Sequence, residues 1–190
     1  PYLEAQDGEF YKNQTFIPYG IFGDYYITEW TPWDEWNPTG LIESYAYYVK
    51  ENINPRQLII IGDLWWNLTT ISHLIGSLGI IGKVKIVWVL SKNERSLVYA
   101  HAKWWIYVGY HYSRWPSISL ANSYKIPLYI SDIPDFDNYH GSRMSINQLD
   151  ALNEILINEP SKIRWISTSN NKEIIQAYTR IIAEWNLQKS

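Results

Sequence analysis

Three aspartates stand close together after an apolar run in the second half of this 190-residue chain. The run, residues 126–130, is predicted to be a buried strand, and Asp132, Asp135 and Asp137 follow it in a loop opened by Pro134. Ligands of open α/β sheets bind at the carboxyl ends of the strands, and carboxylates suit Mg²⁺ or Mn²⁺. In an extended segment Asp135 and Asp137 would project to the same side. The pattern predicts a divalent-metal site, with an ordinary turn as the alternative interpretation.

Other kinds of reactive site find little support. The chain has no cysteine, which excludes disulfides, thiolate catalysis and cysteine zinc sites. Of the four histidines, only His140, three residues beyond Asp137, is placed to join the aspartates. Gly62 stands alone after its predicted strand, so the G-x-G-x-x-G fingerprint of a dinucleotide fold is missing, and residues 76–84 fail the P-loop pattern.

Composition excludes several partners. The net charge of −3 and the pI of about 5.8 argue against nucleic-acid binding. The sequence has no apolar run of about 18 residues and no signal-peptide pattern, so we expect no transmembrane segment and a cytoplasmic location, in the host if the protein is viral. The 11 Trp and 16 Tyr either fill the core or, near strand ends, stack on sugars or bases.

Strands and helices alternate along the chain up to the aspartate loop. Strands are predicted at residues 25–28, 57–61, 83–90 and 126–130. Helices are predicted from residue 38, capped by Asn37, to the breakers at 52–55, at 69–78, and at 94–112, capped by Ser91 or Asn93, with an irregular connection at 115–125. The alternation predicts an α/β fold: a mostly parallel sheet with helices on both faces. A helix to residue 158, a strand at 162–167 and a helix at 171–187 follow as a small C-terminal αβα portion.

This order of elements resembles the nucleotide-binding half of GT-A fold glycosyltransferases, especially the inverting family-two type, in a compact form such as an archaeal virus would encode. The second strand, closed by Gly62-Asp63, is similar to the strand whose terminal aspartate contacts the nucleoside, although the family usually has two adjacent acids there. Residues 25–30 with Thr31 resemble the first strand and its nucleoside-binding turn. Asp135-Phe136-Asp137 stands at the Asp-x-Asp metal motif. The resemblance covers residues 25–137 as a pattern of elements.

The resemblance implies a metal-dependent transferase that moves a sugar from a nucleotide-sugar donor to a hydroxyl group of a glycan or protein acceptor. Mn²⁺ or Mg²⁺ would neutralise the diphosphate leaving group. In a single domain, 1–190, residues 21–137 would form the nucleotide-sugar-binding half and 138–190 a small acceptor-side portion. The implied donor contacts are Trp30, Thr31, Asp63 and Lys103, and the implied metal ligands are Asp135, Asp137, Asp132 and His140. The implied general base is Asp150 or, second, Glu154.

Two other functions stay open. Clustered aspartates also hold the two metals of nucleases and phosphohydrolases, although the acidic pI does not support a nuclease. The chain is alternatively a non-catalytic α/β interaction protein. Retention of a donor site distinguishes the transferase from the interaction protein.

Overall fold

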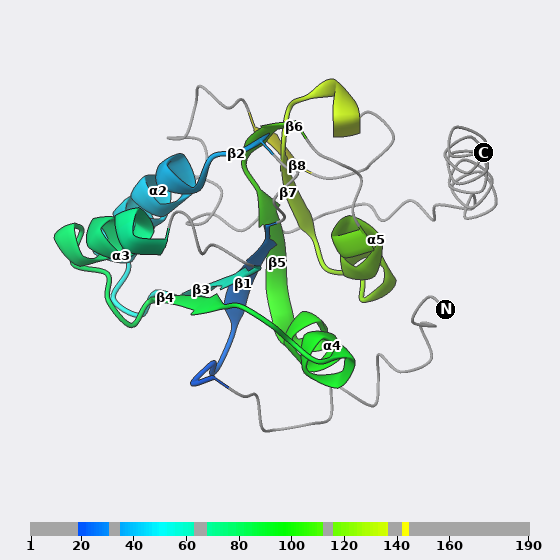
Figure 1. The fold of residues 1–190 in the computed structure, drawn as a ribbon, viewed down its shortest axis with the longest axis horizontal. Coiled ribbons are helices and arrows are strands. Elements are labelled where there is room, and N and C mark those ends of the chain that lie inside the picture. Colours follow the sequence, from blue (N-terminus) through cyan, green and yellow to red (C-terminus); the bar gives the residue numbers. More distant parts are fainter. Residues whose placement is uncertain (1–18, 31–34, 63–67, 112–115, 137–141, 145–190) are drawn as a thin grey trace, which may run out of the picture.

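A six-stranded sheet forms the centre of the computed structural model, which describes residues 19–30, 35–62, 68–111, 116–136 and 142–144 (Figure 1). Its order is β4-β3-β1-β5-β7-β8, and every neighbouring pair is parallel. The sheet strands are β1 (Tyr25–Glu29), β3 (Gln57–Ile61), β4 (Val84–Val87), β5 (Ala102–Tyr107), β7 (Leu128–Ser131) and β8 (Ser142–Met144). A separate antiparallel pair joins β2 (Glu35–Trp36) to β6 (Gly109–His111).

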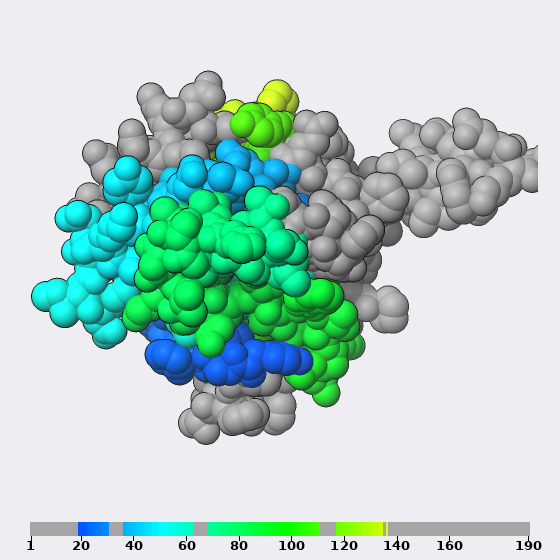
Figure 2. Space-filling view, turned by 60° about the vertical axis from the view of Figure 1, so that its left-hand side comes forward, coloured from blue at the N-terminus to red at the C-terminus, as the bar shows by residue number. Residues whose placement is uncertain are grey.

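Helices cover both faces of this sheet, as the alternation predicted. The helices are α2 (Pro38–Glu51), α3 (Leu68–Ser77), α4 (Lys92–His101) and α5 (Pro116–Ser123), and η2 (Pro134–Phe136) is a short 3₁₀ helix. Helices α2 and α3 lie together on one side of the sheet, with α4 and α5 on the other (Figure 1). In Figure 2 the α2–α3 side comes forward as one continuous surface. The α/β class is therefore confirmed.

The strand order corrects one inference from the sequence. Counted along the chain, the six sheet strands lie in the order 3-2-1-4-5-6, which is the order of the doubly wound dinucleotide-binding fold. The missing glycine fingerprint argued against this fold. The absence of the G-x-G-x-x-G motif was misleading evidence, because this motif shows only how a loop binds pyrophosphate. The strand order depends instead on right-handed crossovers that bury the sheet.

The predicted helix at 94–112 is wrong in its second half. Helix α4 ends at His101, and the next residue, Ala102, is already extended and begins β5. The run from Trp104 to Val108 is almost completely buried, as expected of a central strand covered on both faces. The aromatic and β-branched residues of this run favour a strand. Because no Gly or Pro marks the boundary between α4 and β5, the prediction from the sequence continued the helix beyond its true end.

Helix α5 was missed altogether. Pro116, Ser117, Asn122 and Ser123 suggested turns, yet Pro suits the first position of a helix, and the buried Ile118 and Ala121 lie three residues apart. The other predicted elements up to residue 131 are confirmed with small shifts, above all at the third strand, which spans only residues 84–87. The predicted elements beyond residue 144 lie outside the described residues.

The two predicted helix starts carry real caps. The Asn37 side chain accepts a hydrogen bond from the Gly40 backbone N–H at 2.9 Å, with Pro38 at the first helical position. Of the two candidates for α4, Ser91 is the cap, and it forms a reciprocal capping box with Glu94. Local sequence therefore determines where α2 and α4 begin.

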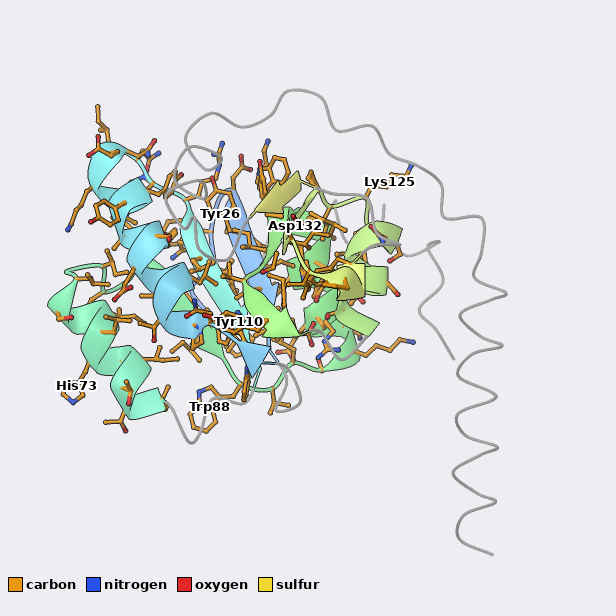
Figure 3. All side chains as sticks on the ribbon, turned by 90° about the horizontal axis from the view of Figure 1, so that it is seen from above. Tyr26, His73, Trp88, Tyr110, Lys125 and Asp132 are labelled. Atoms are coloured by element: carbon orange, nitrogen blue, oxygen red, sulfur yellow. The ribbon has the colours of Figure 1, made fainter. Side chains whose placement is uncertain are left out.

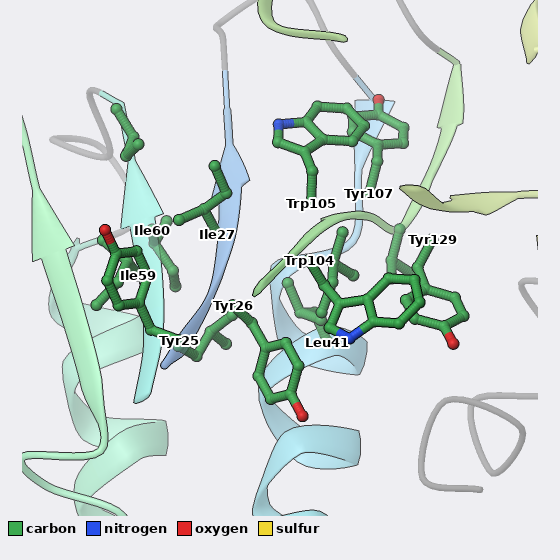
Figure 4. Packing of buried hydrophobic residues seen from close by; sticks show 14 of the residues in the cluster. Tyr25, Tyr26, Ile27, Leu41, Ile59, Ile60, Trp104, Trp105, Tyr107 and Tyr129 are labelled. Carbon is green, nitrogen blue, oxygen red and sulfur yellow. The ribbon is translucent and has the colours of Figure 1, made fainter. Parts of the chain in front are cut away.

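Large aromatic side chains fill both faces of the sheet. Figure 4 shows Trp105 and Tyr107 on one side of β5, with their rings stacked at 6.1 Å, and Trp104 on the other, 4.4 Å from the ring of Tyr129. Neighbouring residues alternate because successive side chains of a strand point to opposite faces. These rings are almost completely buried, and in the described part of the chain most of the Trp and Tyr side chains fill the core. No helix in the described part of the chain is long and apolar enough to cross a membrane.

Candidate functional site at the carboxyl edge of the sheet

The switch point of this sheet lies between β1 and β5. From β1 the chain runs outward through β3 and β4, then returns across β1 to β5 and continues outward to β7 and β8. In open α/β sheets, ligands bind outside the carboxyl ends of the strands where the direction of winding reverses. The residues that end β1 and β5, and those that α4 brings beside them, therefore form the candidate site.

Gly62 allows the ends of β1 and β3 to meet closely. The Trp30 N–H donates to the Ile61 carbonyl at 2.8 Å, and the Gly62 N–H donates to the Val87 carbonyl at 3.0 Å. Gly62 has a φ of +131°, and a Cβ there would lie 2.2 Å from the Trp30 carbonyl oxygen. Glycine is therefore required at this position, where the resembled family usually has an acid.

Glu29, the last residue of β1, is a buried carboxylate between two groups of α4. Its Oε1 lies 2.5 Å from Arg95 Nη2, and its Oε2 accepts a short hydrogen bond from the Tyr99 hydroxyl. The side chain of Glu29 is 7% exposed, whereas that of Arg95 is 37% exposed. Residues 95 and 99 are one turn apart, so the same face of α4 presents both to the carboxylate.

The electrostatics of this cluster keep Tyr99 protonated. Burial is the main cause that raises the pKa of the Tyr99 hydroxyl well above 10.0, and the charge of Glu29 raises it further. Tyr99 therefore stays a hydrogen-bond donor to Glu29 at any physiological pH. Removing a carboxylate and a guanidinium from water costs several kcal/mol for each ion, which their attraction offsets only when the geometry is good.

The ends of β5 and β7 are joined by Ser131. Its buried hydroxyl accepts a hydrogen bond from the Gly109 N–H at 2.9 Å and lies 3.3 Å from the Tyr107 carbonyl, to which it donates. The rings of Trp30 and Trp36 are in contact near the end of β1, with centroids 6.1 Å apart. Side-chain contacts therefore join neighbouring segments on both sides of the switch point.

Two aromatic side chains near strand ends are exposed and remain candidates for stacking. Trp88 directly follows β4 and is 47% exposed, and Tyr110 lies in β6, just beyond β5, and is 57% exposed. Figure 3 shows the Trp88 ring at the periphery of the described structure. These rings differ from the buried core rings because solvent reaches them.

The aspartate loop follows the predicted strand, but its first part is a tight turn. Asp132 is exposed directly after β7, at the carboxyl edge (Figure 3). The Ile133 N–H donates to the Ser131 carbonyl and the Phe136 N–H to the Ile133 carbonyl, both at 3.0 Å. Asp135 lies within η2, so the extended geometry that would align it with Asp137 is wrong for residues 134–136. The described residues contain no cluster of three or more His, Asp or Glu side chains suited to a metal ion.

The structure places only some of the expected site residues at the carboxyl edge of the sheet. Trp30 and Asp132 both follow strands at the carboxyl edge. Lys103 is exposed at the amino end of β5, where its neighbours Ala102 and Trp104 pair with Tyr25 and Tyr26. It therefore lies at the opposite edge from the switch point. The remaining expected residues lie outside the described residues: Thr31, Asp63, Asp137, His140, Asp150 and Glu154.

Sequence reasoning missed the Glu29–Arg95–Tyr99 cluster. Glu29 carried a signal, because it is an acid that closes a predicted strand, the same feature that drew attention to the aspartates. Arg95 and Tyr99 carried only their four-residue spacing on the predicted helix. No local pattern connects them to Glu29, which is 70 residues from Tyr99 in the sequence.

No family description and no curated protein sequence matches this chain. Its fold is similar to that of the C-terminal domain of a group 1 family glycosyl transferase, LpcC, from Francisella tularensis, at 15% identity, a TM-score of 0.60, and coverage of 83% of this chain and 89% of that one. A UDP-forming trehalose-phosphate synthase from Burkholderia xenovorans is similar at 9% identity and a TM-score of 0.64, over 82% of this chain and 42% of that one. HepE from Anabaena, in complex with UDP and glucose, is similar at 15% identity and a TM-score of 0.57, over 71% and 38%.

The chain spans less than half of the larger proteins that it matches, including 29% of TarM at a TM-score of 0.59. It corresponds in extent to the isolated C-terminal domain. These likenesses show that the chain has the fold of a domain found in several sugar transferases.

Proposed function

We propose that this chain is the nucleotide-sugar-binding domain of a glycosyltransferase that transfers a sugar to a hydroxyl group of a glycan or protein acceptor. The observation that carries the proposal is the switch point between β1 and β5 in a fold shared with such a domain. Ligands of this sheet class bind at that point. HepE, similar in fold, is described in complex with UDP and glucose.

We place the chain with GT-B type transferases rather than with the GT-A type that the sequence resembled. The support is the all-parallel order 3-2-1-4-5-6 and the extent of the match to one C-terminal domain. In this assignment the donor occupies the edge at β1, and the acceptor site is built by residues outside the described sheet. Asp150 and Glu154 stay sequence-based candidates for the general base.

We propose that the base of the nucleotide donor stacks on the ring of Trp88. Adjacent strands are about 4.8 Å apart, so the end of β4, two strands from β1, lies about 10 Å from the switch point. A nucleoside diphosphate with its phosphates at β1 would place its base near this exposed ring. Stacking on Trp suits any base, so this contact supplies affinity without selecting the base.

Divalent-metal dependence stays a proposal from the sequence pattern. Asp132 is one exposed carboxylate at the edge, and its expected partners Asp137 and His140 lie outside the described residues. A bound Mg²⁺ or Mn²⁺ would neutralise charge on the diphosphate leaving group. The residues of this chain that would hold it remain the four expected from the sequence: Asp132, Asp135, Asp137 and His140.

Thermal unfolding with a panel of nucleoside diphosphates, with and without Mn²⁺, tests the function. A ligand that binds only the native state stabilises it by about 2.7 kcal/mol at a concentration of 100 times its Kd, so one diphosphate should raise the melting temperature by several degrees. Trp88→Ala should weaken that response, and Asp132→Asn should weaken only its metal-dependent part. Tyr47→Ala, an exposed aromatic on α2, is the matched control.

Two outcomes would redirect the assignment. No shift with any diphosphate in a folded protein would favour the non-catalytic interaction protein. Metal-dependent cleavage of a phosphodiester substrate, without a diphosphate response, would favour the nuclease or phosphohydrolase.

A further inference from the structure

We propose that Arg95 binds the diphosphate group of the nucleotide donor and that Glu29 is a positioning residue that holds the Arg95 guanidinium at the switch point. The inference rests on the proposed function and deepens it, because it names the residue that recognises phosphate. The expected donor contacts from the sequence include neither residue.

The position of Arg95 follows from the course of α4. The helix leaves the carboxyl end of β4 and returns to the amino end of β5, so its first turn lies toward the carboxyl edge. Arg95 belongs to that first turn, and its N–H donates to the Ser91 carbonyl at 2.9 Å. Its guanidinium reaches the last residue of β1, which is where the strand order reverses.

Both oxygens of the Glu29 carboxylate contact side chains of α4. One oxygen pairs with Arg95 Nη2 at 2.5 Å, and the other accepts from Tyr99, which stays protonated. With 7% exposure, the carboxylate itself is a poor contact for a ligand. Its effect on a ligand would therefore pass through Arg95.

Arg95 keeps donors for a second anion. A guanidinium has five N–H donors in a planar fork, and Glu29 is the only one of the described residues to form an ion pair with it. The side chain is 37% exposed, so solvent and ligands reach part of it. A planar fork suits the bidentate recognition of phosphate oxygens.

A contribution to folding stability does not by itself explain the Glu29–Arg95 ion pair. Replacing a buried ion pair with well-packed apolar residues is often neutral or stabilising, so the pair is weak evidence for a purely structural role. A charge pair at the ligand-binding edge has a use that an apolar pair lacks, because it presents a fixed cation to an anionic ligand.

The chain offers a matched control at the opposite edge. Arg56 Nε lies 3.5 Å from Asp24 Oδ2, and the Arg56 side chain is 28% exposed, close to the exposure of Arg95. Arg56 directly precedes β3 and is therefore at the amino edge of the sheet. Removing this guanidinium changes the net charge as removing Arg95 does, but at the wrong edge.

Isothermal titration of UDP and of uridine separates phosphate recognition from base recognition, with GDP and guanosine in their place if the panel selects guanine. Arg95→Met should weaken UDP binding about ten- to a hundredfold, the usual effect of losing a hydrogen-bonded charge, and leave uridine binding unchanged. Glu29→Gln should weaken UDP binding by less and also spare uridine. Arg95→Lys should recover part of the loss, and Arg56→Met should change neither ligand.

The outcomes are distinguishable. If the wild-type protein binds neither UDP nor uridine, nor their guanine counterparts, the proposed function fails and this inference fails with it. If the wild type binds UDP and Arg95→Met keeps the same UDP-to-uridine affinity ratio, the assignment of Arg95 is overturned while the donor site stands. An equal loss of both ligands in Glu29→Gln identifies a structural pair and also overturns the assignment. Circular dichroism of each variant establishes folding. If Arg95→Met does not fold, the UDP-to-uridine affinity ratio is measured with Arg95→Lys and Glu29→Gln instead.

Discussion

At the scale of residues, the carboxyl edge depends on two positions with different needs, Glu29 and Gly62. Glu29 needs charged and polar partners because it is buried at the end of β1. Gly62 needs the absence of a side chain because the Trp30 carbonyl approaches it closely. Together they shape the edge at which the proposed donor binds: one fixes a cation there, and the other lets β1 and β3 end side by side.

Gly62→Ala should lower the free energy of unfolding by about 2–4 kcal/mol, since it adds both backbone strain and a clash with main chain. Urea denaturation measures the loss. Gly76→Ala is the matched control, because a Cβ at Gly76 of α3 meets nothing within 4 Å, and Ala should stabilise that helix by up to about 1 kcal/mol. Equal stability of Gly62→Ala and wild type would show that β1 and β3 do not approach as described.

At the scale of elements, α4 and α5 show how helix ends are fixed by single residues. The capping box of Ser91 and Glu94 begins α4 and so sets the position of Arg95 one residue later. The end of α5 is closed by two hydrogen bonds, from Lys125 N–H to the Asn122 carbonyl and from Ile126 N–H to the Ala121 carbonyl, both at 2.9 Å. This is the Schellman pattern, with Lys125 at the left-handed position.

Glu94→Gln should reduce stability at neutral pH and have much less effect in acid. Hydrogen bonds from the Ser91 hydroxyl, then the Ser91 backbone N–H, then Tyr19 lower the pKa of Glu94 below 4.5. The charged form therefore contributes stability that is complete above the unfolded pKa and is lost as the pH falls through the folded pKa. Urea midpoints of wild type and variant at about pH 7 and about pH 3 measure this, with Glu51→Gln as control. A gap that stays constant with pH would contradict the charged capping box.

Lys125→Gly should raise the free energy of unfolding by about 1 kcal/mol. Lys125 has a φ of +57°, a conformation that costs a residue with a Cβ roughly 1–2 kcal/mol and costs glycine almost nothing. Thermal and urea unfolding measure the gain. Lys92→Gly, in the first turn of α4, should instead destabilise, and a loss in both variants would contradict the left-handed end of α5.

At the scale of the whole molecule, six parallel strands covered on both faces form one sheet, and the proposed donor site lies at its carboxyl edge. The buried aromatic and β-branched side chains of β1, β3, β5 and β7 form its core. The chain spans only part of the larger transferases with this fold. The prediction that one nucleoside diphosphate raises its melting temperature therefore concerns this domain as a whole. A diphosphate response measures what this domain does by itself, without an acceptor.

Sequence alone determined much of the fold because its signals are local. The β-branched run of β3, the apolar period of α2 and the caps at Asn37 and Ser91 each depend on neighbouring residues, and the structure confirms them. Asp132, which directly follows β7, lies at the carboxyl edge of the sheet as expected, for the same reason. The composition, without cysteine, also excluded whole classes of chemistry.

Only the tertiary structure decided the strand order and the candidate site. Residues 104–108 were apolar enough for a buried helix or a buried strand, and β5 became a strand because β1 and β7 pair with it on either side. Glu29 meets Arg95 and Tyr99 because the crossover from β4 to β5 lays α4 over the end of β1. Such contacts arise from the packing of elements distant in sequence, and no local periodicity encodes them.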